Sequence, residues 1–189
     1  MTNAQLAPAE SGRYDAVAQL FHWTVVALVV LQYATKWVPV GFASLTERQL
    51  NAWHLAVGPT ILALMLLRLA WRLTHRTPPP PSDLPASLRL LSRATHWLFY
   101  AVLIVLPILG WAAASGYGAT PTLLGIVPLP ALVAQNKALA ETVGSVHGAL
   151  ALALLAVIAL HVSGALYHAL VKQDGVVGRM LPATGAGRP

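Results

Sequence analysis

Four long runs of apolar residues divide the chain, and most of its polar and charged residues lie between them. The runs cover about residues 16–38, 52–73, 94–114 and 146–171. Each has about the 20 residues that a helix needs to cross the hydrocarbon core of a bilayer. Backbone groups in that core must be hydrogen-bonded within the chain, so each run predicts a transmembrane helix. The predicted fold class is therefore all-α, an integral-membrane four-helix bundle.

The polar segments set the predicted domain organisation. Residues 1–15 form an N-terminal tail, residues 16–172 the four-helix transmembrane domain, and residues 173–189 a C-terminal tail. The longest connection, residues 114–145, contains glycines and prolines that indicate turns. Within it, residues 131–140 favour a short helix that lies on the outer membrane face.

Composition excludes several classes of protein. The chain is 57% hydrophobic and 10% charged, whereas an average soluble domain is about 25% charged. The sequence contains no cysteine. Disulfides, cysteine-ligated zinc, iron–sulfur clusters and thioether-attached haem are therefore excluded.

The distribution of basic residues predicts the orientation. The N-terminal tail, the second connection with its flanking helix ends, and the C-terminal tail together hold nine of the 12 basic residues. These are Arg13, Arg68, Arg72, Arg76, Arg89, Arg93, Lys172, Arg179 and Arg188. The positive-inside rule then places both termini in the cytoplasm. The net charge of +6 indicates topology and contact with lipid headgroups. It does not indicate nucleic acid, because no soluble domain is predicted to present it.

Tryptophans gather near the ends of the predicted helices, which is typical of an interfacial aromatic belt. They are Trp23, Trp37, Trp53, Trp71, Trp97 and Trp111.

Six of the seven histidines lie in or at the edge of a predicted span, where ionisable residues indicate function. His161 follows His147 by 14 residues, which is about 21 Å along a helix axis and about 40° in azimuth. One helix face therefore presents an imidazole near each side of the membrane. Helix directions place His54 opposite His147 on the outside and His22 opposite His161 on the inside. Two such bis-imidazole sites in a bundle core are what two b haems require.

Several further residues are candidates for the same chemistry. Small residues lie beside the four histidines and are expected to leave room for a macrocycle, namely Gly58, Gly144, Gly148, Ser163 and Gly164. His96 is an alternative ligand or a quinone hydrogen-bond donor. His168, two turns after His161, lines a propionate or quinone pocket or lies at the interface. Arg68 and Arg72 extend to headgroups or pair with the propionates of an inner haem.

An ordered set of short motifs runs through nearly the whole chain, from Arg13 to Pro182. The motifs are Arg13-Tyr-Asp, Phe21-His-Trp23, Trp53-His-Leu-Ala-Val-Gly58, Leu67-Arg-Leu-Ala-Trp-Arg72, His96-Trp-Leu-Phe-Tyr100, Leu106-Pro-Ile-Leu-Gly110, Val146-His-Gly148, Leu160-His161, Tyr167-His168 and Gly178-Arg-Met-Leu-Pro182. With this set the chain resembles the bacterial cytochrome b561 family, which is related to the cytochrome b subunit of nickel–iron hydrogenases.

The resemblance implies a multi-pass protein of the bacterial inner membrane with two non-covalent b haems. It also implies electron transfer in the respiratory membrane that involves ubiquinone, and some members look like superoxide oxidases. The haem iron ligands of the family carry over to His22, His54, His147 and His161. We therefore expect an oxidoreductase or electron carrier that oxidises superoxide at the periplasmic face and reduces ubiquinone.

Two alternatives remain open from the sequence. One is a cytochrome b membrane anchor that passes electrons between a partner dehydrogenase or hydrogenase and quinone. The other is a histidine-lined metal transporter, since imidazoles also bind zinc and copper. The spans lack the Asp and Glu residues that such a transporter would be expected to add.

Overall fold

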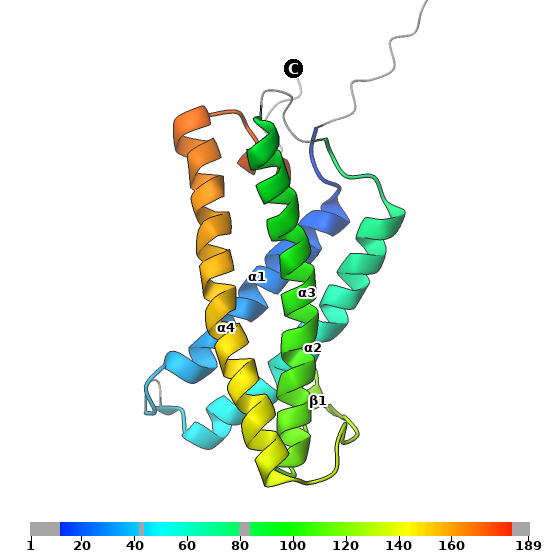
Figure 1. Cartoon of the computed structure of the whole chain (residues 1–189), viewed down its shortest axis with the longest axis vertical. Helices are drawn as coiled ribbons and strands as arrows, with labels where there is room; N and C mark the ends of the chain where they lie inside the picture. Colours follow the sequence, from blue (N-terminus) through cyan, green and yellow to red (C-terminus); the bar gives the residue numbers. More distant parts are fainter. Residues whose placement is uncertain (1–11, 42–43, 80–83, 183–189) are drawn as a thin grey trace, which may run out of the picture.

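Four long helices form the chain (Figure 1), as described by a computed structural model of residues 12–41, 44–79 and 84–182. They are α1 (Ala16–Trp37), α2 (Glu47–Thr74), α3 (Ala86–Gly116) and α4 (Lys137–Leu166). A π-helical segment, Tyr167–Lys172, and a 3-10 turn, Val177–Met180, follow α4. All four helices are long and apolar enough to cross a membrane, which confirms the predicted bundle.

Three of the four helices, α2, α3 and α4, begin earlier than the predicted spans, and capping side chains mark the start of two of them. Thr46 and Gln49 form a capping box at the start of α2, and the Asn136 side chain accepts the Leu139 N–H at the start of α4. The apolar pattern marks only the stretch suited to hydrocarbon. The short helix predicted for residues 131–140 is wrong: α4 begins at Lys137, and residues 131–136 are not helical.

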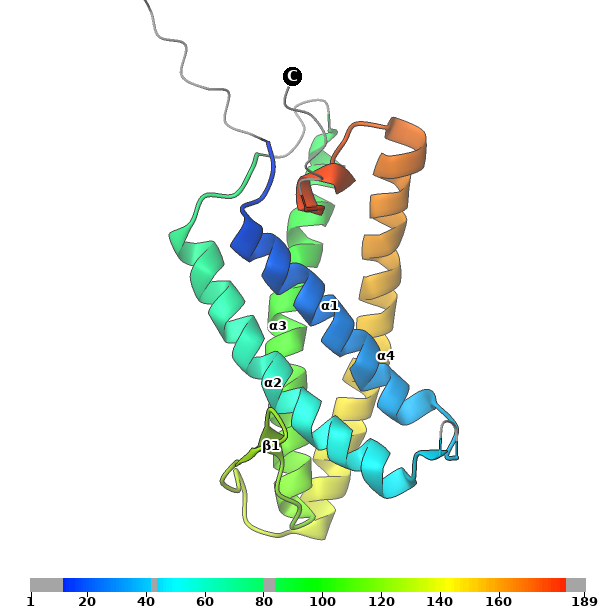
Figure 2. The ribbon, with the colours of Figure 1, turned by 180° about the vertical axis from the view of Figure 1, so that it is seen from behind.

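The packing of the helices leaves most of their surface outward-facing. Figure 2 shows α1 and α2 side by side, with α3 and α4 behind them. The buried core lies between the helices and consists of Val25, Ile61, Met65, Tyr100, Val102, Leu103 and Leu154. Large apolar side chains elsewhere on the helices are exposed, such as Leu152 at 64% and Leu170 at 70%. Such a surface suits acyl chains as solvent.

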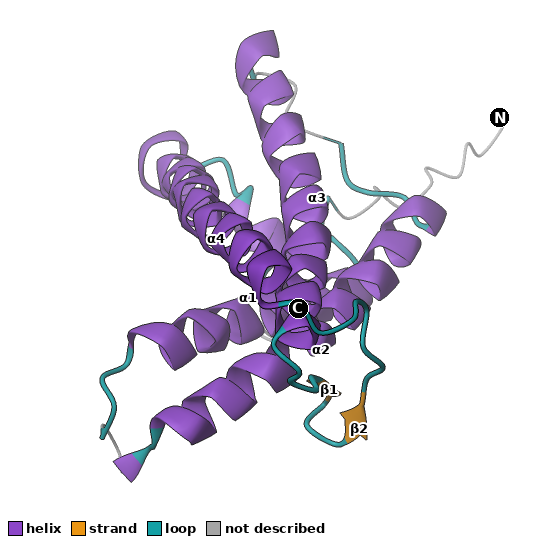
Figure 3. Ribbon diagram, turned by 60° about the horizontal axis from the view of Figure 1, so that its bottom comes forward, coloured by secondary structure: helices purple, strands orange, loops and turns teal. Residues whose placement is uncertain are grey.

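The two ends of the bundle differ in their covering. A short antiparallel hairpin lies between α3 and α4, formed by β1 (Thr122–Leu123) and β2 (Val127–Pro128), and Figure 3 shows it beside α2. We call the end where α3 meets α4 the hairpin end. The opposite end, where α1 begins, is the terminal end.

The segment that follows α4 closes the terminal end. The Arg179 carbonyl accepts the backbone N–H of Tyr14 at 3.0 Å and the Gln19 side chain at 3.3 Å. The Trp23 indole donates to the Met180 carbonyl at 2.9 Å. Residues more than 150 positions apart are thereby joined, and the first two turns of α1 are covered.

Candidate functional site

His54 and His147 face each other near the hairpin end, with ring centres 6.1 Å apart. The His54 Nδ1 lies 3.0 Å from the Thr35 hydroxyl, and that hydroxyl donates its own proton to the Gln32 carbonyl at 2.7 Å. The hydroxyl is therefore left as an acceptor, so the proton of the neutral ring is on Nδ1. The Nε2 lone pair of His54 remains available to bind a metal.

The ring of His147 is fixed in the same tautomer. Its Nδ1 lies 2.9 Å from the Leu106 carbonyl of α3, which can only accept. Gly110 lies one turn further along α3 on the same face. A Cβ at Gly110 would approach the His147 ring to 2.9 Å. The absent side chain at Gly110 therefore lets the imidazole reach the Leu106 carbonyl.

Three imidazoles gather toward the terminal end. The ring centre of His161 lies 6.3 Å from that of His22 and 5.4 Å from that of His96. The His96 Nδ1 donates to the Ser92 carbonyl at 2.6 Å, which leaves Nε2 as an acceptor. The structure thus adds His96 to the predicted inner pair.

Arg68 and Arg72 lie beside these rings on α2. An Arg68 guanidinium nitrogen is 3.4 Å from the His22 Nδ1, and Arg72 lies over the rings of Trp97 and Tyr100. Both arginines line a small cavity that also includes His96 and Tyr100. Among the described residues neither arginine forms an ion pair with a carboxylate. Their charge is available to an anionic group.

The spacing of the imidazole pairs fits a metal that takes two protein ligands. A metal–imidazole bond is about 2 Å long, so rings on opposite sides of one metal have centres about 6 Å apart. The pairs at 6.1 and 6.3 Å meet this condition, and the 5.4 Å pair is tighter. Within the described ranges no group of three or more ligating side chains is arranged to hold a bare metal ion. Haem iron would need only two ligands from the protein, which such a pair of imidazoles could supply.

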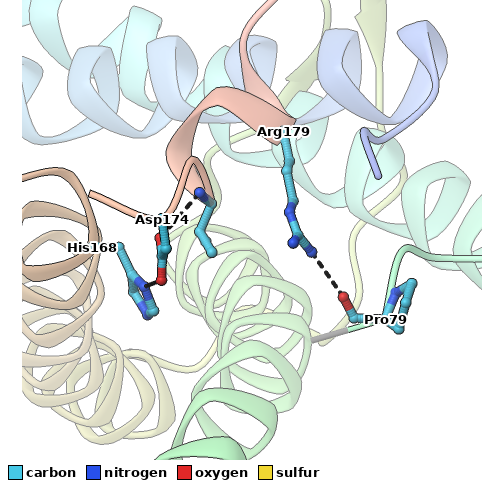
Figure 4. Close-up of polar contacts among 5 residues, drawn as sticks. Pro79, His168, Asp174 and Arg179 are labelled. Carbon is cyan, nitrogen blue, oxygen red and sulfur yellow. Dashed lines mark hydrogen bonds and ion pairs between the residues drawn. The ribbon is translucent and has the colours of Figure 1, made fainter. Parts of the chain in front are cut away.

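His168 lies apart from this cluster, within the segment that closes the terminal end. Its Nδ1 is 2.6 Å from an Asp174 carboxylate oxygen (Figure 4). Desolvation acts to raise the pKa of Asp174, but hydrogen bonds from His168 and the Val176 N–H outweigh it and leave the pKa below its ordinary value. Figure 4 also shows Arg179 donating to the Pro79 carbonyl, at 2.8 Å. His168 therefore has a carboxylate partner that sequence reasoning did not assign.

Thr35 and Gly110 are the residues that sequence reasoning missed. No sequence pattern points to Thr35, because its hydroxyl contacts His54 of another helix. Gly110 belongs to one of the family motifs, and its position one turn after Leu106 is the signal that could have identified it. Of the glycines expected to leave room, Gly148 and Gly164 have no atom within 4 Å of an added Cβ.

The chain is similar to known bacterial membrane cytochromes. Residues 13–183 match the family described as prokaryotic cytochrome b561. A probable superoxide oxidase, CybB, from Yersinia pestis is 30% identical over 174 residues, covering 90% of this chain and 96% of the relative. Cytochrome b561 homolog 2 from Escherichia coli strain K12 is 27% identical, covering 89% and 91%. Homolog 1 from the same strain is also 27% identical, covering 90% and 97%.

The matched region includes all four helices and every histidine discussed above. Members of this family are membrane helical bundles that bind b-type haem and transfer electrons. With its four spanning helices and bacterial relatives, the protein is a multi-pass protein of the bacterial inner membrane. The chain belongs to the prokaryotic cytochrome b561 family.

Proposed function

We propose that this chain binds two b haems and carries electrons from superoxide at the hairpin end to ubiquinone at the terminal end. His54 and His147 hold one haem, and His22 and His161 hold the other. The observation that carries the proposal is the pair of imidazole separations, 6.1 and 6.3 Å. The two pairs are offset along α4 by 14 residues, about 21 Å. Together they mark a path along most of the membrane thickness.

The basic residues support an orientation for this path. Nine of the 12 belong to the tails, the second connection and its flanking helix ends, and eight of these are among the described residues, at the terminal end. The positive-inside rule makes that end cytoplasmic, including the tails at residues 1–15 and 173–189. The hairpin end is then periplasmic.

Haem iron, when bound, supplies one-electron chemistry. The chain's contribution at the hairpin end is to hold both rings by their Nδ1–H groups, which orients Nε2 and makes it a stronger donor. Thr35 and the Leu106 carbonyl are the two acceptors.

Cationic residues support an anionic donor at the hairpin end. The Lys137 ammonium lies 3.8 Å from Glu141, so its charge is offset. Lys36 instead donates to the neutral Asn51 side chain at 2.7 Å. Arg48 lines an open depression together with Glu47, Asn51 and Thr120, so the Glu47 carboxylate offsets its charge there. Lys36 is therefore the cation that supports attraction of superoxide at this end.

Residues near the terminal end bind the haem propionates and the quinone. Arg68 and Arg72 pair with propionate carboxylates. The His96 Nε2 accepts a hydrogen bond from a quinol hydroxyl. The same ring donates to a quinone carbonyl only when it is doubly protonated. His168, held against Asp174, is the second candidate for the quinone environment.

Turnover by the purified protein tests this function. Two superoxide anions give up one electron each and form two O₂, while one ubiquinone takes two electrons and two protons and forms ubiquinol. With superoxide supplied to proteoliposomes, we expect quinol to form at half the rate of superoxide loss. If the haem is reduced only by a partner dehydrogenase or hydrogenase, the protein is instead a cytochrome b membrane anchor that passes electrons from that partner to quinone. If the protein binds no haem, the electron-transfer proposal fails and metal transport is tested next.

Replacing Gly110 by alanine is expected to empty the site at the hairpin end. The added methyl would lie 2.9 Å from the His147 ring, too close for the ring to keep its place. His147 then loses the Leu106 carbonyl, and we expect haem content to fall from about two per chain toward one. The measurement is haem per polypeptide by pyridine haemochromogen. Gly178→Ala is the control, since no atom lies within 4 Å of its added Cβ. Equal haem in the two variants would contradict the packing argument.

A further inference from the structure

The connection between α3 and α4 is uncharged and apolar although it joins two membrane helices at their exit. From Ala114 to Asn136 the chain has no Asp, Glu, Lys, Arg or His. At its tip Leu124 is 65% exposed, Ile126 76% and Val127 52%. In water these side chains would form an unprotected apolar surface.

This hairpin folds back along the helix bundle. Figures 1 and 2 show it turning from the hairpin end and running along the helices. Its tip is bonded to α2: the Leu124 N–H donates to the Thr60 hydroxyl at 3.1 Å. Trp53 and Trp71 mark the two ends of the apolar part of α2, 18 residues or about 27 Å apart. Thr60 lies seven residues inside Trp53, so the tip contacts α2 about 10 Å along the helix axis from that tryptophan.

The backbone of the hairpin has few N–H donors that lack a partner, which suits an environment with little water. Prolines at 121, 128 and 130 remove three N–H donors. Further donors are bonded inside the protein: Ile126 to Leu123, Leu129 to Pro121, and Leu132 to the Ser115 hydroxyl. Trp111 donates its indole N–H to the Pro130 carbonyl at 2.9 Å. An unbonded donor is costly in an apolar medium, and the chain has removed or bonded most of those near the tip.

The turn at the tip uses an unusual residue. Leu124 has a φ of 55° and Gly125 a φ of 76°, a left-handed pair that in aqueous hairpins favours Asn-Gly. Leucine is strained in this conformation. The strain is offset when the exposed leucine side chain lies in an apolar solvent.

We propose that the hairpin, residues 122–128, is inserted into the lipid leaflet at the hairpin end, with Leu124, Ile126 and Val127 among the acyl chains of the phospholipids. The position of the tip along α2, the uncharged sequence, the bonded donors and the leucine turn all favour acyl chains over water. The inference does not depend on the haem ligands or on the electron donor.

Single-cysteine labelling tests the insertion, because the chain has no cysteine of its own. A nitroxide is attached to Ile126→Cys in the haem-loaded protein, reconstituted in bilayers. Leu152→Cys, on the exposed middle of α4, is the membrane reference, and Ala138→Cys, beside Lys137, is the aqueous reference. Collision with oxygen and with an aqueous nickel chelate is then measured for each label.

We expect the oxygen-to-nickel ratio at position 126 to be nearer that of position 152 than that of position 138. A ratio nearer that of position 138 would overturn the proposal. Protection of position 126 from both probes would also overturn it, since a protein partner rather than lipid would then cover the hairpin.

A second variant separates lipid from water at the turn. Leu124→Asn relieves the backbone strain and would stabilise an aqueous hairpin. In acyl chains the same change places an amide in an apolar medium. We expect the Tm of the variant in lipid nanodiscs to fall below that of the wild type. An equal or higher Tm would place the tip in water and overturn the insertion.

Discussion

Replacing His147 by alanine should lower the haem content of the purified protein from two to about one per polypeptide. The variant loses the α4 ligand at the hairpin end, and His54 alone offers one imidazole to that site. Loss of a residue that merely orients a ligand costs about 10–100-fold in metal affinity, and loss of the ligand itself should exceed this. The measurement is the pyridine haemochromogen, together with the reduced-minus-oxidised spectrum.

His75→Ala provides the control for this experiment. His75 is exposed at the end of α2 and stacks on Trp71, with ring centres 3.5 Å apart. His75→Ala should retain both haems, because the ring lies outside both imidazole pairs. If His147→Ala also retains two haems with an unchanged spectrum, the ligand scheme at the hairpin end is wrong.

The second large effect concerns the three imidazoles near the terminal end. His161→Ala should remove the haem at that end and leave the other. The reason is that the His161 ring lies near both His22 and His96, so either possible ligand pair includes it. His96→Ala should retain both haems, since the His22–His161 separation of 6.3 Å fits a shared iron better than the 5.4 Å between His96 and His161. Haem content and the low-spin electron paramagnetic resonance signals measure the difference.

The reverse result is equally informative. If His96→Ala loses a haem while His22→Ala retains both, the α3 histidine is the ligand. Arg68, which already lies 3.4 Å from the His22 Nδ1, would then hold His22 away from the iron. In the expected case His96→Ala should instead raise the KM for quinone.

The sequence predicted the bundle and the pairing of its histidines for a simple reason. Helix periodicity places His147 and His161 on one face, and the alternating helix direction brings His54 and His22 to the matching depths. Both inferences need only spacing along the chain. In the structure the ring centre of His54 lies 6.1 Å from that of His147, and the ring centre of His22 lies 6.3 Å from that of His161.

Spacing along the chain does not predict which side chains meet between neighbouring helices. The rotation of α3 about its axis decides that Gly110 meets His147 and that His96 joins His161, and an apolar pattern does not fix that rotation closely enough. His168 shows another limit. The α-helix changes to a π-helical segment at Tyr167, and Gln173 then adopts a φ of 51°. The chain turns back there, so Asp174 reaches the imidazole.

The closure of the terminal end by the last described residues has a consequence for biosynthesis. Gln19 and Trp23 leave the ribosome early, but their acceptors at Arg179 and Met180 are made about 160 residues later. At about 5–20 residues per second, that interval is on the order of ten seconds or more. During it α1 resides in the membrane without this covering. The terminal end can therefore assemble only after all four helices have been made, and a chain that stops before Arg179 has four helices but leaves the first helix uncovered.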